Sequence, residues 1–277
     1  MIAIINKKFK TISFILIIMT LLLQFSSCKL SKTESPPETG LSVICTSYPE
    51  LTEMPRYEPT VAELQNTMFP QKYKYYKHRC HVSLENGSIV ISDKSVTTSQ
   101  HILKGNYGYF VGVDLGEFGG WCKYYEYGSN EGALFAKSNC YALISVDLDK
   151  GYMISKKASA EQNGITHITK LTREKDSSEW NAELITSFVG APLCYAYSDT
   201  DHLIYITTSS ELLKIDLEGG ECATLTTPSY YSYLFPQTMV MHKGKLLLGA
   251  LTGVFEYDLS SDTSAFYRME FEKYISE

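Results

Sequence analysis

The sequence lacks the concentrated positive charge that nucleic-acid-binding proteins carry. Its 277 residues include 25 Lys and Arg against 31 Asp and Glu, which gives a formal net charge of -6. Beyond the N-terminal 40 residues, residues 72–79 form a short basic cluster, and no other is found. A nucleic-acid binder normally presents a basic patch or stripe. We therefore expect no nucleic-acid partner.

Several catalytic and metal-binding motifs are also missing. No Cys-x-x-Cys pair occurs, so the sequence shows neither a thioredoxin-type redox motif nor a zinc ribbon. The nucleophile motif G-x-S-x-G and the metalloprotease motif H-E-x-x-H are absent as well. The glycine-containing stretch 109–125 leads into a β-rich run, whereas a phosphate-binding loop opens onto a helix N-terminus. We expect no cofactor and no metal site.

The N-terminus has the layout of an export signal. Lys7, Lys8 and Lys10 precede an apolar run from Thr11 to Leu23. This run is shorter than the roughly 20 residues that a membrane-spanning helix needs, and a basic segment before a short apolar one is typical of a cleaved signal peptide. We assign residues 1–27 to the signal peptide.

The end of the signal, Phe25-Ser26-Ser27-Cys28, resembles the lipobox of bacterial lipoproteins, although leucine is commonest where Phe25 stands. The resemblance implies that Cys28 is lipidated and becomes the mature N-terminus, so that the membrane itself is a partner. The alternative is an ordinary signal peptide with an incidental cysteine.

Residues 28–44 form the predicted lipidated tether. The polar stretch KLSKTESPPETG after Cys28 has two prolines and too little apolar surface to form a core. Lys29 stands where many Gram-negative lipoproteins of the inner membrane have aspartate. By that resemblance we expect a lipid-anchored protein of the bacterial cell envelope, on the outer membrane or another extracytoplasmic face.

Of the 7 cysteines, six remain after Cys28, namely Cys45, Cys80, Cys122, Cys140, Cys194 and Cys222. An exported chain meets an oxidising compartment, which permits disulfides. The spacing does not select a connectivity. Buried free thiols are the alternative.

An internal repeat gives the clearest signal for the fold. Residues 202–217 align with residues 244–259 at a constant offset of 42, with Asp216 over Asp258 and Leu217 over Leu259. Each copy reads as a strand, a turn and a second strand, and weaker strands flank it. Four short strands in about 40 residues is the spacing of a β-propeller blade.

The same rhythm extends upstream to about residue 97, and the resemblance is to secreted bacterial β-propellers in general. We predict an all-β domain over residues 45–277, a β-propeller of about five blades. A β-sandwich is the structural alternative. Architecture of this kind does not fix chemistry.

The loop from Asp114 to Gly120 is expected to be a turn between the second and third strands of a blade. Gly116, Gly119 and Gly120 are predicted to adopt positive φ there. Its acids, Asp114 and Glu117, are candidate ligand-binding residues. Glycoside hydrolysis uses two carboxylates, but those of propeller enzymes come from several blades, and these two share one loop.

A group of tyrosines, Tyr230, Tyr231 and Tyr233, lies between two predicted blades, and a tyrosine-lined surface suits a glycan or a protein ligand. The sequence therefore favours a binding or interaction module without catalytic residues. The alternative is a hydrolase of glycans or cell-wall material with acids near the propeller axis.

Overall fold

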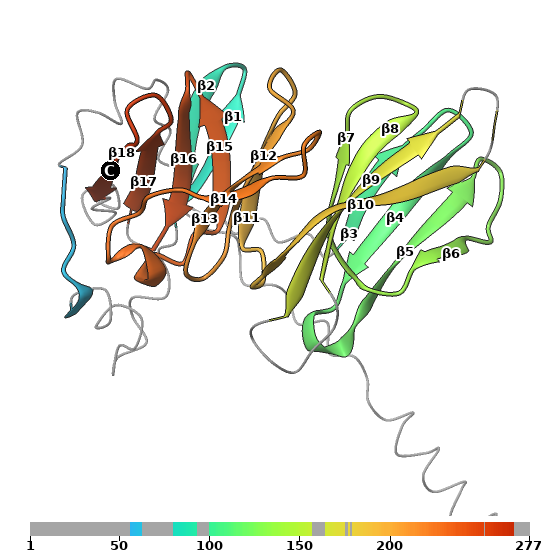
Figure 1. Ribbon diagram of the computed structural model, residues 1–277, viewed down its shortest axis with the longest axis horizontal. Coiled ribbons are helices and arrows are strands. Elements are labelled where there is room, and N and C mark those ends of the chain that lie inside the picture. Colours follow the sequence, from blue (N-terminus) through green and yellow to red (C-terminus); the bar gives the residue numbers. More distant parts are fainter. Residues whose placement is uncertain are drawn as a thin grey trace, which may run out of the picture. The chain divides into compact units, whose positions relative to one another are not determined.

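The computed structural model describes residues 56–62, 80–92, 100–156, 164–174, 177, 179–251 and 253–268. Within these residues the fold is all-β, and its strands form five antiparallel sheets (Figure 1). Cys28, the signal peptide and the tether lie outside the described residues. In the described part of the chain, no helix is long and apolar enough to cross a membrane.

Four of the sheets are four-stranded meanders, in which each strand pairs with the next one along the chain. The first contains β3 (Gln100–Lys104), β4 (Gly108–Asp114), β5 (Gly120–Glu126) and β6 (Ala133–Ala136). The second contains β7 (Asn139–Ser145), β8 (Lys150–Lys156), β9 (Ile165–Arg173) and β10 (Trp180–Val189).

The third meander contains β11 (Cys194–Ser198), β12 (Leu203–Thr207), β13 (Leu212–Asp216) and β14 (Cys222–Thr224). The fourth contains β15 (Thr238–His242), β16 (Lys245–Ala250), β17 (Gly253–Asp258) and β18 (Thr263–Arg268). Four antiparallel strands in consecutive order make up a propeller blade, so these sheets are blade-like.

Several middle strands of the second, third and fourth meanders are buried on both faces. β8, β12, β16 and β17 are buried along almost their whole length, whereas all three residues of β14 are exposed. A strand covered on both faces is encoded by a continuous apolar run rather than by strict alternation. This explains why the sequences LIYIT of β12 and KLLLGA of β16 predict strands although apolar and polar residues do not alternate in them.

The internal repeat is confirmed down to the pairing register. Leu203 pairs with Asp216 in the third meander, and Lys245 pairs with Asp258 in the fourth, so both members move by the same 42 positions. The turn after each aspartate is equivalent too. The Glu218 backbone N–H donates to Asp216 Oδ1, and the Ser260 N–H donates to Asp258 Oδ1, both at 2.9 Å.

The fifth sheet has two strands, β1 (His81–Glu85) and β2 (Ser88–Ser92), joined by an Asn86-Gly87 turn. Both turn residues have positive φ, which is the geometry that Asn-Gly favours in a two-residue hairpin. The sheet packs on the last meander, where the Val82 N–H donates to Thr238 Oγ1 at 2.7 Å. Residues close to the start of the domain therefore contact its last sheet.

The sheets are connected through shared hydrophobic clusters. One cluster joins the first and second meanders, another the second and third, another the third and fourth, and another the fourth and the two-stranded sheet. None of these clusters of described residues joins the two-stranded sheet to the first meander. The expected all-β architecture is thus present, with four blade-like sheets and one two-stranded sheet, but the sheets do not close into a ring.

Candidate functional site

A cleft of about 560 Å³ lies between the third and fourth meanders. This volume falls within the range of small-molecule sites, roughly 300–1,000 Å³. Both sheets supply its lining, which consists of Thr200, Asp201, Tyr205, Lys214 and Leu225 from the third and Met241, Gly244, Tyr257, Leu259, Ser260 and Asp262 from the fourth.

The apolar part of the lining comes from strands and from the residues that end them. Tyr205 on β12 and Tyr257 on β17 are almost wholly buried, so they form walls rather than exposed platforms. Leu225, Met241 and Leu259 are partly buried and belong to the same hydrophobic cluster. The cleft therefore has a rigid base in the core of the protein.

Two carboxylates stand at the rim on turns of different sheets. Asp201, in the β11–β12 turn, accepts a hydrogen bond from Ser198 Oγ at 2.8 Å. Asp262, in the β17–β18 turn, accepts one from the Tyr257 hydroxyl. Each interaction uses one carboxylate oxygen, and both residues are exposed. Since a carboxylate has about four acceptor positions, each retains capacity for a ligand.

The rim also carries hydrogen-bond donors. Lys214 on β13 is exposed, and its ammonium group has three N–H donors. Burial raises the pKa of the Tyr205 phenol, and the nearby Asp201 carboxylate raises it further. The phenol is therefore protonated at neutral pH and is a donor. The cleft combines acceptors, donors and apolar surface, which suits a polar ligand that has all three.

In the described part of the chain, no group of three or more His, Cys, Asp or Glu side chains is arranged to hold a metal ion.

The sequence reasoning missed the cleft, although one signal for it existed. The repeat keeps its offset of 42 from residue 203 to 216, but the turn before it differs between the copies. Residues 199–202 connect β11 to β12, whereas only Lys243 and Gly244 connect β15 to β16. The longer turn carries Thr200 and Asp201, both of which line the cleft. A length difference at one turn of an otherwise regular repeat was the available clue.

The loop with Asp114 and Glu117 lies between β4 and β5, in the expected hairpin, and contributes nothing to the cleft. Asp114 Oδ1 accepts a hydrogen bond from the Gly116 N–H at 2.7 Å. Glu117 is exposed in a short 3₁₀ turn, Gly116–Phe118. A ligand role for either acid stays a prediction.

The expected glycine geometry in this loop is partly wrong. Gly116 and Gly119 have positive φ, at 62° and 87°. Gly120 does not, because it is the first residue of β5 and pairs with Asp114. Its lack of a side chain has another cause. A Cβ built there would lie 2.2 Å from the Val113 carbonyl oxygen and 2.6 Å from Asn139 Oδ1.

The tyrosine group lies between the third and fourth meanders, as expected, but two of its rings face inward. Tyr230 and Tyr231 are buried, and Tyr231 makes an edge contact with Phe255 at 5.3 Å between ring centroids. Tyr231 and Tyr233 belong to a 3₁₀ turn that places the segment against the core. Of the three, only Tyr233 keeps a partly exposed ring, so the structure gives Tyr230 and Tyr231 a packing role.

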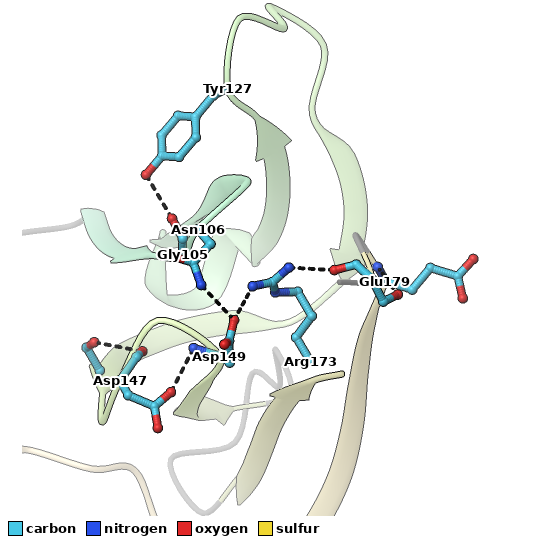
Figure 2. A network of polar contacts seen from close by, with 9 residues as sticks. Gly105, Asn106, Tyr127, Asp147, Asp149, Arg173 and Glu179 are labelled. Atoms are coloured by element: carbon cyan, nitrogen blue, oxygen red, sulfur yellow. Dashed lines mark hydrogen bonds and ion pairs between the residues drawn. The ribbon is translucent and has the colours of Figure 1, made fainter. Parts of the chain in front are cut away.

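A second polar cluster lies between the first and second meanders (Figure 2). Arg173, the last residue of β9, forms an ion pair with Asp149 in the β7–β8 turn. The Arg173 side chain is 1% exposed and the Asp149 side chain 38%. The guanidinium carbon lies 4.4 Å from the centroid of the Tyr107 ring, so the charge is stacked on an aromatic face.

The β3–β4 turn of the first meander supplies the other partners. Asn106 Nδ2 donates to Asp149 Oδ1 at 3.1 Å, and the Tyr127 hydroxyl donates to the Gly105 carbonyl at 3.0 Å (Figure 2). Arg173 also donates to the Ser177 carbonyl at 2.5 Å. Because the guanidinium is buried and already paired, this cluster fastens two sheets together and is a poor ligand site.

Comparison with known proteins does not assign the chain to a family. No family model matches it, and no curated protein matches it. Several solved structures are similar to it, including the following three. A nidogen–laminin complex has a TM-score of 0.35 and 9% identity, covering 69% of this chain and 90% of that chain. The WD40 β-propeller domain of Doa1 has a TM-score of 0.34 and 11% identity, covering 46% and 39%.

The third, apo AztD from Citrobacter koseri, has a TM-score of 0.37 and 13% identity, covering 68% of this chain and 54% of that chain. At such scores and identities these likenesses assign no function.

Proposed function

We propose that the protein is a lipid-anchored binding module of the bacterial cell envelope and that its cleft between the third and fourth meanders binds a glycan. The cleft is the observation that carries the proposal, because it is a concave site with convergent polar groups on a rigid base. The resemblance of residues 25–28 to a lipobox supports the location.

The chemistry of the rim favours a hydroxyl-rich ligand. At the rim, Asp201 and Asp262 accept hydrogen bonds and Lys214 donates them, and the Tyr205 phenol is a donor in the wall of the cleft. Sugar hydroxyls do both, and the C–H faces of a sugar ring complement Leu225, Met241 and Leu259. Two carboxylates and one lysine leave the rim net negative, which disfavours an anionic ligand such as a nucleic acid.

Binding is tested with the full chain in detergent micelles on an array of neutral and acidic oligosaccharides. Asp201→Asn and Lys214→Met should each weaken binding of a captured oligosaccharide about tenfold, which corresponds to about 1.4 kcal/mol. Asp199→Asn is the matched control, because Asp199 is in the same turn but does not line the cleft. Equal binding by all three variants would place the glycan elsewhere, and no captured glycan would refute the ligand class.

Glycan hydrolysis is the second candidate function. Asp201 and Asp262 come from two sheets and line one cleft, and glycosidases act with two carboxylates on either side of the sugar bond. The same oligosaccharides, incubated with the protein, should then release new reducing ends. Loss of that release in Asp201→Asn and Asp262→Asn would establish the hydrolase, and unchanged oligosaccharides would leave the binding module.

The lipid anchor is tested separately. Cys28→Ala should move the protein from the membrane fraction to the soluble fraction, because one thiol carries the whole anchor. Metabolic labelling with a fatty-acid analogue should mark the wild type and leave the variant unmarked. An unlabelled wild type, or a variant that partitions into detergent as the wild type does, would contradict lipidation at Cys28.

A further inference from the structure

Two cysteines from different sheets meet in the core between the first and second meanders. Cys122 lies on β5 and Cys140 on β7, 18 positions apart, and both are fully buried. They belong to one hydrophobic cluster, together with Leu103, Phe110 and Leu171. The connection between the sheets at this point is therefore made by apolar packing with two thiols in it.

A glycine creates the space in which the thiols meet. Gly112 on β4 is the direct cross-strand partner of Cys122. A Cβ built on Gly112 would lie 2.2 Å from Cys140 Sγ, so that sulfur occupies the place of the missing side chain. Side chains directly opposite each other on neighbouring strands stand about 5 Å apart on one face. Cys140 Sγ is thus held beside the Cys122 side chain.

The strands are irregular at both cysteines. The β5–β6 register shifts between Cys122 and Lys123, and the β7–β8 register shifts between Cys140 and Ala142. A β-bulge locally bends a strand and redirects a side chain. Cys140 Sγ donates to the Ala142 carbonyl at 3.8 Å, and the Cys122 side chain is near enough to raise the pKa of the Cys140 thiol.

The other described cysteines lie elsewhere in the domain. Cys80 lies in the cluster under the two-stranded sheet, Cys194 in the cluster between the third and fourth meanders, and Cys222 is exposed on β14. Cys194 contacts Thr207 Oγ1 at 3.3 Å. Within the described residues, Cys122 and Cys140 are the two cysteines that share a cluster.

We propose that Cys122 and Cys140 form a disulfide that covalently joins the first and second meanders. In its formation, one thiolate attacks the disulfide of an oxidant and a mixed disulfide results. The thiolate of the second cysteine then attacks the mixed disulfide, and the oxidant sulfur leaves as a thiolate. The two electrons and the two thiol protons of the cysteine pair pass to the oxidant disulfide, which becomes a dithiol or two thiols. The oxidant class is a thiol–disulfide oxidoreductase of the exporting compartment, or oxidised glutathione in vitro.

The bond is expected to form before this core closes. Both sulfurs are inaccessible in the folded protein. The nearby Cys122 side chain and burial raise the pKa of the Cys140 thiol, so the attacking thiolate is suppressed after folding. The same burial protects the finished bond. Formation of the disulfide in cells depends on export, which is part of the proposed function. The choice of Cys122 and Cys140 as partners does not depend on export.

The experiment has two arms that separate these claims. In the first, the full chain is unfolded in urea with dithiothreitol and refolded in a glutathione redox buffer. Free thiols are then alkylated under denaturing conditions, and a digest is analysed by mass spectrometry without reduction. The expected product is a linked peptide pair containing Cys122 and Cys140, lighter than the two free peptides by two hydrogen atoms. Alkylation of both residues, or pairing of either with a different cysteine, would overturn the proposal.

The second arm compares two preparations. One is wild-type protein purified from the envelope. The other is a variant in which a methionine replaces Met1–Ser27, so that the protein stays in the cytoplasm. The link is expected in the first preparation and absent from the second. Dithiothreitol should leave it intact in native protein and cleave it in urea. If the disulfide forms in the first arm but envelope-purified protein has free thiols, its formation in cells would be refuted. If dithiothreitol rapidly reduces the disulfide in native protein, its burial in the core would be refuted.

Discussion

Replacing Asp149 by asparagine should destabilise the protein, because it leaves the buried Arg173 guanidinium without its counter-charge. Removal of one partner from a fully buried ion pair costs about 3–5 kcal/mol. The Asp149 side chain is 38% exposed, so water partly solvates the remaining charge. We therefore expect roughly half of that cost, about 2 kcal/mol.

For a domain of this size, a loss of about 2 kcal/mol lowers Tm by about 4–8 °C. Thermal unfolding followed by circular dichroism, together with urea titration, measures the change. Asp147→Asn is the matched control, because Asp147 is an exposed acid in the same turn that accepts a hydrogen bond from the Asp149 N–H at 2.7 Å. It should alter stability by no more than about 0.5 kcal/mol.

A double variant tests the cause. Arg173→Met combined with Asp149→Asn removes the buried charge as well as its partner, and methionine fills the space beside Tyr107 and Trp180. Replacement of a buried pair by apolar groups is often neutral. The double variant should therefore recover most of the stability lost in Asp149→Asn. If it is less stable than the single variant, or if Asp149→Asn behaves as Asp147→Asn does, the reasoning about the buried charge is wrong.

Two further predictions concern the turns. Gly120→Ala should lower the free energy of unfolding by more than about 2 kcal/mol, because its Cβ would collide with the Val113 carbonyl oxygen. Gly119→Ala, at φ 87° in open space, should lower it by about 1 kcal/mol. Equal Tm values for the two variants would contradict this order. The Ser260 hydroxyl and N–H hold the pKa of Asp258 down at about 2. Since this lies below the unfolded value of about 3.9, the stabilisation is present above that pH and is lost as pH falls through about 2. Urea midpoints between pH of about 4.5 and about 2 should therefore fall less in Asp258→Asn than in the wild type, and parallel curves would count against the shifted pKa.

The repeat was predictable because its strands are continuous apolar runs that end in the same Asp-Leu pair. A constant offset in such runs fixes strand order and pairing together, and Leu203–Asp216 and Lys245–Asp258 show the outcome. β6 was missed because Ala133–Ala136 is a short edge strand whose residues are exposed or only partly buried, so no pattern marks it. Strand order can thus be predicted from local hydrophobic patterns, and exposed edge strands have only weak patterns of this kind.

The candidate site residues were harder to predict, because contacts between sheets bring them together. Asp201 and Asp262 are far apart in the sequence, and no spacing rule joins them. The inward orientation of Tyr231 depends on Phe255, a strand residue of the next sheet. The meeting of Cys122 and Cys140 depends on Gly112 and on two register shifts, which are invisible in cysteine spacing.

The docking of the two-stranded sheet on the last meander also bears on when the protein can fold. Val82 and Thr238 are 156 residues apart in sequence, and Tyr57 donates its N–H to the Phe266 carbonyl near the end of the last strand. Contacts of such long sequence separation form late and slow the folding rate. A ribosome-bound or partly exported chain does not yet contain both halves of this interface. The domain is therefore expected to stay incomplete until synthesis of its last strand has finished, so that the proposed export would act on an unfolded chain.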